Sequence, residues 1–105
     1  MKAIIIHGWD QKPVDEWLPW LADQLKSKDW EVELPTTPNA AMPKLSEWMD
    51  KLLSLDPNEE TVLAGHSLSN SLILKYLERV DAKLKSTYLV AAWDYLVPAL
   101  EQEHI

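Results

Sequence analysis

Residues 61–80 constrain the fold of this chain more strongly than any other segment. Thr61–Ala64 is a short apolar run that predicts a buried strand, and Leu68–Val80 predicts a well-buried helix, since apolar residues occupy much of its circumference. Because Gly65–Ser69 leaves almost no room between them, the strand must turn sharply into the helix. Such a turn presents its middle residue, Ser67, above the carboxyl end of a sheet. The segment therefore predicts an α/β fold with an exposed serine.

The remaining sequence repeats the alternation of strand and helix. We expect three further strands and two further helices, together with a short helical tail: strands at Ala3–Ile6, Trp30–Leu34 and Thr87–Ala92, helices at Pro13–Lys28 and from Pro43, and the tail at Leu96–Glu103. The first helix presents Val14 on its apolar face and the second presents Leu53. This order predicts a three-layer α/β/α sandwich with a four-stranded parallel sheet in the strand order 2-1-3-4. The loops after Ile6 and Ala64 then meet at the edge where ligands bind.

Composition excludes several classes of function. The chain of 105 residues predicts a single domain, and 17 acidic against 10 basic residues give a net charge of −7. No basic run interleaved with aromatic residues is present, so we expect neither nucleic acid nor membrane as a partner. The absence of cysteine excludes disulfides, zinc–thiolate sites and thiol nucleophiles, and three scattered histidines predict no metal or other cofactor. The first apolar run is too short for a signal peptide or membrane span, so we expect a cytoplasmic protein.

The turn residues point to nucleophilic chemistry. A serine hydroxyl is a weak nucleophile and needs an adjacent base and donors for the developing oxyanion. In Gly65-His66-Ser67-Leu68-Ser69, small residues stand two positions before and after the serine, which gives the pattern G-x-S-x-S. We interpret Ser67 as the nucleophile of a strand-to-helix elbow. The alternative is a serine that caps a helix and has no further role.

A wider set of motifs resembles one family over nearly the whole chain. In matching order they are His7-Gly8, Trp17-Leu18-Pro19-Trp20-Leu21, Leu34-Pro35 with Pro38, Pro43-x-Leu45-x-x-Trp48, and Thr61 to Leu68. Together they resemble the YdeN-type and retinoblastoma-binding-protein-type small serine hydrolases. The resemblance implies an α/β-hydrolase fold, a Ser-Asp-His triad and hydrolysis of small esters or amides. By position it implies that Ser67 is the nucleophile, and that the backbone N–H groups of Trp9 and Leu68 are the oxyanion donors.

The chain departs from this family at two places. Ser69 stands where a glycine is usual, and family members are longer, with their triad aspartate and histidine beyond later strands. We therefore expect residues 1–105 to form a single truncated α/β-hydrolase-like domain. Ser67, Asp94 and His104 keep the triad order along the chain. We favour the alternative for the last two, in which Asp94 belongs to a solvated loop and His104 to a frayed terminus.

Each histidine or tryptophan beside the expected site could have either a structural or a functional role. His7 and Gly8 begin the oxyanion loop, and we expect His7 to order that loop by hydrogen bonding rather than to act as a base. His66 also favours a structural role, because neighbouring side chains on such a turn diverge. Trp9 and Trp93 either line a substrate pocket or belong to the core.

The last strand bears on assembly. Residues 87–92 are an apolar strand that would form an exposed sheet edge, and such edges pair with other chains. We expect a homodimer through this strand.

Two functions remain, an esterase-like serine hydrolase and a non-catalytic paralogue that serves as a binding or assembly module. A flavodoxin-like phosphate binder fits the element order, but a chain with two glycines lacks the glycine-rich loop that it needs.

Overall fold

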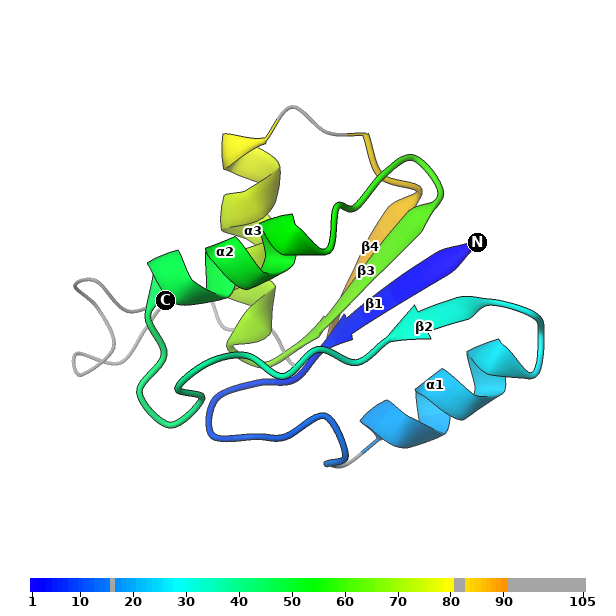
Figure 1. Ribbon diagram of the computed structural model, residues 1–105, viewed down its shortest axis with the longest axis horizontal. Coiled ribbons are helices and arrows are strands. Elements are labelled where there is room, and N and C mark those ends of the chain that lie inside the picture. Colours follow the sequence, from blue (N-terminus) through cyan, green and yellow to red (C-terminus); the bar gives the residue numbers. More distant parts are fainter. Residues whose placement is uncertain (16, 81–82, 91–105) are drawn as a thin grey trace.

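The computed structural model of the protein describes residues 1–15, 17–80 and 83–90. In chain order the elements are β1 (Lys2–Ile6), α1 (Leu18–Lys26), β2 (Glu31–Glu33), α2 (Leu45–Ser54), β3 (Thr61–His66), α3 (Ser69–Arg79) and β4 (Ser86–Val90). All strand pairings are parallel, and the sheet has the order β2-β1-β3-β4 (Figure 1). The predicted parallel sheet and its order are confirmed.

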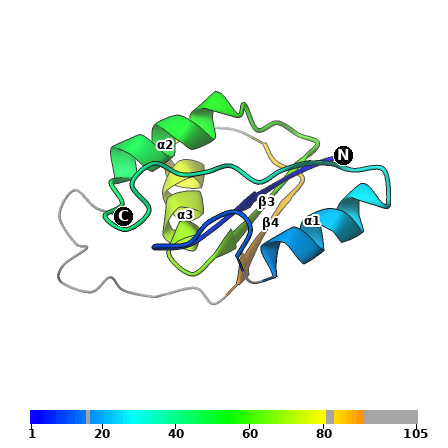
Figure 2. The same cartoon turned by 60° about the horizontal axis from the view of Figure 1, so that its bottom comes forward.

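Helices cover both faces of the sheet. Along β1, Ile4 and Ile6 point into a core formed with α2 and α3, whereas Ala3 and Ile5 point into a second core formed with α1. This alternation follows from the two-residue period of a strand, which requires apolar residues at every position when both faces are covered. Figure 2 shows α1 separated by the sheet from α2 and α3. The predicted three-layer arrangement is confirmed.

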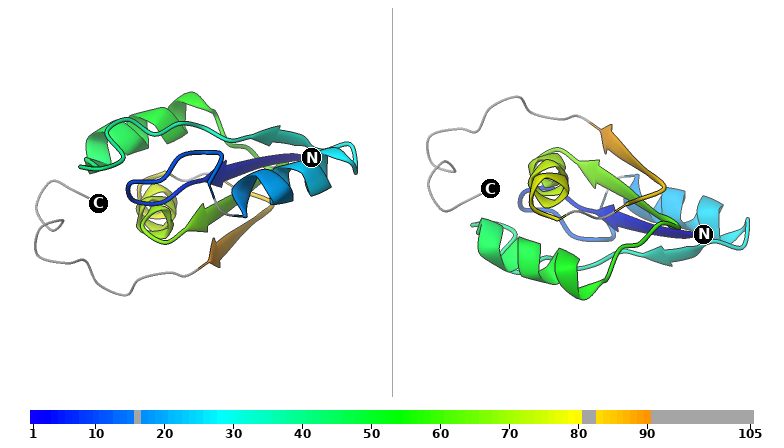
Figure 3. Two further views of the ribbon diagram at one scale, coloured as in Figure 1. Left: turned by 90° about the horizontal axis from the view of Figure 1, so that it is seen from below. Right: turned by 90° about the horizontal axis from the view of Figure 1, so that it is seen from above.

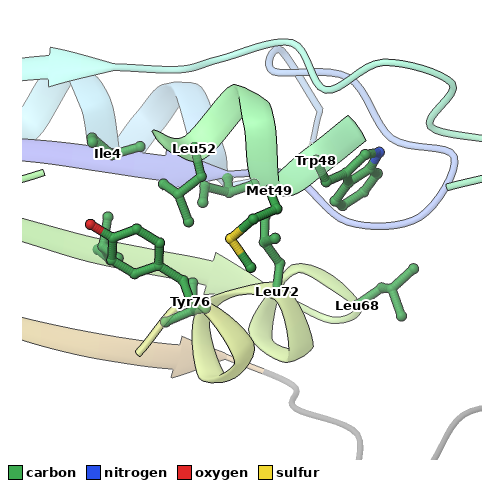
Figure 4. Close-up of a cluster of buried hydrophobic side chains, with 10 residues drawn as sticks. Ile4, Trp48, Met49, Leu52, Leu68, Leu72 and Tyr76 are labelled. Carbon is green, nitrogen blue, oxygen red and sulfur yellow. The ribbon is translucent and has the colours of Figure 1, made fainter. Parts of the chain in front are cut away.

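The larger core lies between the sheet and the two helices α2 and α3. Its buried members are Ile4, Ile6, Trp48, Met49, Leu52, Leu63, Leu68, Leu72, Ile73 and Tyr76 (Figure 4). Burial of this apolar surface is the main force that holds α2 and α3 on the sheet. Since Leu68 belongs to this core, the residue after Ser67 anchors the elbow to the rest of the fold.

The first helix begins later than the sequence pattern predicts. It starts at Leu18 instead of Pro13, and Val14, which the periodicity placed on the apolar face, is 72% exposed. The physical reason is Pro19, which has no N–H and is tolerated only in the first turn of a helix. A helix from Pro13 would have placed Pro19 in its interior, against the carbonyl of Asp15.

Two further expectations of burial are wrong. Leu53 of α2 is 42% exposed, and α3 is less buried than predicted because Leu74 and Leu77 are 51% and 37% exposed. Each helix packs one face on the sheet, so apolar residues on its outer side stay in contact with solvent. The predicted tail at residues 96–103 lies outside the described residues. Among the helices described, none has the length and apolar character needed to cross a membrane.

Candidate active site

The loop after β1 and the turn after β3 lie together at the carboxyl end of the sheet (Figure 3). Ile6 and Gly65 are paired in the register of the two strands, so the chain leaves both strands at the same level. The contact is close at Gly8, where an added Cβ would lie 2.8 Å from the carbonyl oxygen of His66 and 3.2 Å from Cβ of Ser67. Only a glycine fits between this loop and the turn.

Ser67 has a strained backbone. Its φ is 57°, in the left-handed region, and the other described non-glycine residues with positive φ are all Asp or Asn. Asp and Asn tolerate this region through local hydrogen bonds, whereas a serine there carries a cost of about 1–2 kcal/mol. Hydrogen bonds hold the strained residue, since its N–H donates to Val90 O at 2.9 Å and its carbonyl accepts from Asn70 N–H at 3.2 Å. A strained serine between a strand and a helix is the geometry of a nucleophile elbow.

Ser69, the departure from the family pattern, joins the two central strands. Its buried hydroxyl accepts from the N–H of His66 at 2.8 Å and donates to the carbonyl of Ile6 at 2.8 Å. A glycine at this position would leave both backbone groups without these bonds. In this chain the serine therefore fixes the ends of β1 and β3 relative to one another.

The backbone N–H groups of the loop after β1 are almost all engaged. The N–H of Gly8 donates to Oε1 of Gln11 at 2.6 Å, that of Asp10 to Ala40 O at 2.8 Å, and that of Gln11 to Gly8 O at 3.3 Å. The indole of Trp9 donates to a carbonyl at 2.7 Å, and the side chain is 41% exposed. The backbone N–H of Trp9, by contrast, donates to no residue that the structure describes. This N–H group is therefore available to a ligand.

A second available donor belongs to Leu68, the residue after Ser67. Leu68 precedes the first turn of α3, and its N–H also makes no hydrogen bond to a described residue. Helix N-termini carry unsatisfied N–H groups and the positive end of the helix dipole, and both favour an anion. Two uncommitted N–H groups thus belong to residues next to the elbow, one in the loop after β1 and one in the turn after β3.

His7 holds the start of the loop after β1. Its Nε2 accepts from the N–H of Thr37 at 3.1 Å, so the ring proton is on Nδ1, which donates to Gly8 O at 3.1 Å. The ring also packs edge-on against Trp48, with centroids 5.9 Å apart. Burial lowers the pKa of His7, opposed by its bond to Gly8 O and by the charge of Asp15. The neutral ring is the form that fits these contacts.

This buried histidine makes stability depend on pH. Because the folded pKa of His7 lies below its unfolded value of about 6.5, the unfolded chain binds the proton more readily. The contribution is complete above pH 6.5 and is lost as the pH falls from there towards the folded pKa. We expect the free energy of unfolding in urea to be lower at pH 5.5 than at pH 7.5. The decrease should be smaller in His7→Gln, which does not titrate, and equal decreases in both proteins would contradict this role of His7.

The side chain of His66 contacts the loop after β1. Its Nδ1 lies 2.9 Å from Oε1 of Gln11, and its ring packs edge-on against Trp17 with centroids 5.4 Å apart. No sequence pattern marks Gln11 or Thr37 as a residue of the site. The remaining candidates, Trp93, Asp94 and His104, lie outside the described residues. Within the described part of the chain, no group of three or more potential ligands could hold a metal ion.

Comparison with known proteins shows to which family the chain belongs. The model of the family described as "Serine hydrolase" matches residues 3–104. The chain belongs to the serine hydrolase family. The putative hydrolase YdeN of Bacillus subtilis (strain 168) is 31% identical over 104 residues, which make up 95% of this chain and 55% of YdeN. The resemblance inferred from the motifs is thereby confirmed.

Solved structures agree with the fold described above. The ydeN gene product of B. subtilis superposes with a TM-score of 0.83 at 28% identity, over 98% of this chain and 57% of that one. An extracellular alpha/beta-hydrolase from a Paenibacillus species superposes with a TM-score of 0.74 at 17% identity, over 91% of this chain and 42% of that one. The second similarity bears on the fold alone, which is that of α/β-hydrolases. The chain spans about half the length of these relatives.

Proposed function

We propose that this protein hydrolyses small esters or amides with Ser67 as its nucleophile. One observation carries the proposal: Ser67 occupies a left-handed turn between β3 and α3, and uncommitted N–H groups belong to Leu68, which follows it, and to Trp9, which follows the closely packed Gly8. In acyl transfer the serine Oγ attacks the carbonyl carbon, and the carbonyl oxygen becomes an oxyanion that two such donors stabilise. Collapse of this intermediate releases the alcohol or amine, and water then hydrolyses the acyl-serine bond.

The proposal requires a general base. Both ring nitrogens of His7 are engaged in hydrogen bonds, which argues against His7 in this role. Along the sequence Asp94 and His104 follow Ser67 in the order of a triad, and both lie outside the described residues. The match covers 55% of YdeN, and a base supplied from outside these 105 residues is the alternative.

Covalent labelling tests the nucleophile directly. A fluorophosphonate probe reacts with an activated serine, so we expect stoichiometric labelling of the protein and its complete loss in Ser67→Ala. Ser71→Ala is a matched control, because Ser71 lies on α3 four residues beyond Ser67 and outside the turn. Labelling should persist in that control. Failure of the unaltered protein to react, with no ester turnover, would contradict the proposal.

A non-catalytic binding or assembly module is the second candidate, and the edge of the sheet favours it. In β4, Tyr88, Leu89 and Val90 are 60%, 40% and 41% exposed. An apolar hollow of about 440 Å³ adjoins this edge, with Trp17, Tyr88 and Val90 among its lining residues. Exposed apolar edge strands pair with other chains, and we propose a homodimer through β4.

Sedimentation tests the dimer. At high protein concentration we expect the mass of two chains, and one chain for Tyr88→Lys, because a charged lysine on an edge strand opposes pairing. Val14→Lys is a matched control, since Val14 is also exposed but lies outside β4. A stable monomer at high concentration would contradict the dimer and leave the labelling result unaffected.

A further inference from the structure

Gln11 bridges the two loops of the candidate site with a single atom. Its Oε1 lies 2.6 Å from the backbone nitrogen of Gly8 and 2.9 Å from Nδ1 of His66. A backbone N–H is only a donor, so the side-chain atom that faces Gly8 is the amide oxygen and not the nitrogen. The same oxygen then accepts the proton of His66 Nδ1. The contacts therefore fix both the orientation of the Gln11 amide and the protonated nitrogen of His66.

The two bridged residues stand immediately before the groups that the proposed chemistry uses. Gly8 precedes Trp9, which carries one uncommitted N–H group. His66 precedes Ser67, the proposed nucleophile. These loops are far apart in sequence, 55 residues separating Gln11 from His66, and their relative position depends on tertiary contacts such as this one. Oxyanion donors act only when they are held at a fixed position relative to the nucleophile.

Gly8 packs closely against both the Gln11 amide and the elbow. An added Cβ on Gly8 would lie 2.7 Å from Oε1 of Gln11 and 3.2 Å from Cβ of Ser67. The Gln11 oxygen and the serine therefore lie on the same side of Gly8. A displacement of the Gln11 side chain would let the loop move relative to the serine.

We propose that Gln11 is a positioning residue that sets the distance between the oxyanion loop and Ser67 and holds His66 in its Nδ1–H form. The proposal rests on the proposed function for its effect on the reaction. The bridge itself does not depend on that function. Gln11 touches no substrate in this role and acts through Gly8 and His66.

The test replaces Gln11 with methionine, which has a similar length but no amide oxygen. We expect fluorophosphonate labelling of Ser67 to become about tenfold to hundredfold slower in Gln11→Met, because misplacement by about 1 Å costs rates of this order. The ¹⁵N signals of the His66 ring should also lose the Nδ1–H pattern, which a purely structural substitution elsewhere would not change. Gln24→Met, on the exposed side of α1, is the matched control and should leave both readouts unchanged.

The two readouts separate the possible failures. If the unaltered protein is not labelled, the proposed function fails, and the His66 signals still decide whether the bridge exists. Gln11→Glu keeps an oxygen acceptor and should retain the Nδ1–H pattern. Unchanged His66 signals in Gln11→Met would overturn the proposal. Slower labelling accompanied by an equal loss of folded protein would also overturn it, because Gln11 would then act on folding alone.

Discussion

Replacement of Trp48 with alanine is expected to lower the free energy of unfolding by about 3–5 kcal/mol, as for other buried aromatic residues. Trp48 is fully buried in the larger core, and its ring packs edge-on against His7. Its indole N–H also donates to Pro38 O at 2.8 Å. Alanine removes the packing and this bond together. Urea denaturation followed by circular dichroism measures the change, and a domain of this size has only about 5–15 kcal/mol of total stability.

Two variants separate the packing of Trp48 from its hydrogen bond. Trp48→Phe keeps an aromatic ring but leaves the Pro38 carbonyl without its donor, and we expect a smaller loss of about 1–3 kcal/mol. Trp20→Ala serves as the control, because Trp20 is 64% exposed and should change stability by less than about 0.5 kcal/mol. Comparable losses in Trp48→Ala and Trp20→Ala would show that the burial described for Trp48 does not determine stability.

The strand positions were predictable because each central strand is a short apolar run. Ala3–Ile6 has no polar residue, as a strand covered on both faces requires. The position of Ser67 in a sharp turn was predictable because no linker separates the strand from the helix that follows. The start of α1 was not predicted correctly, because the apolar spacing through Val14 outweighed the position of Pro19. The spacing of apolar residues indicates which face of a helix is buried, but it does not indicate at which residue the helix begins.

The contacts that hold the site could not be read from the sequence. His7 and Thr37 are 30 residues apart, and Gln11 and His66 are 55 apart. Both pairings depend on the paths of the loops across the end of the sheet, and no local sequence pattern determines these paths. A glutamine in a surface loop is also common, so Gln11 gave no signal of its own. In the sequence Ser69 is visible only as a departure from the family pattern, and its bonds to two strands depend on the register of β1 and β3.

Gly65→Ala is expected to disrupt the elbow and to lower the free energy of unfolding by about 1–3 kcal/mol, as overpacking does in other cores. A Cβ at this position would lie 2.5 Å from Oδ1 of Asn70 and 2.8 Å from Cδ1 of Ile73. Asn70 cannot move without cost, because its Nδ2 donates to Val90 O at 2.8 Å. That carbonyl also accepts the N–H of Ser67, so labelling of the serine should fall as well.

A double-mutant cycle identifies the contact responsible for this effect. Asn70→Ala alone removes the bond to Val90 O but also removes Oδ1, which is buried with no partner among the described residues. It should therefore cost only about 1 kcal/mol. In this background Gly65→Ala no longer meets its closest obstacle, while the end of the Ile73 side chain can turn aside. Its cost should then fall by about 1 kcal/mol or more, a coupling typical of residues in contact. Equal costs of Gly65→Ala in both backgrounds would exclude Asn70 as the obstacle and would leave Ile73 or the turn itself as the source of the strain.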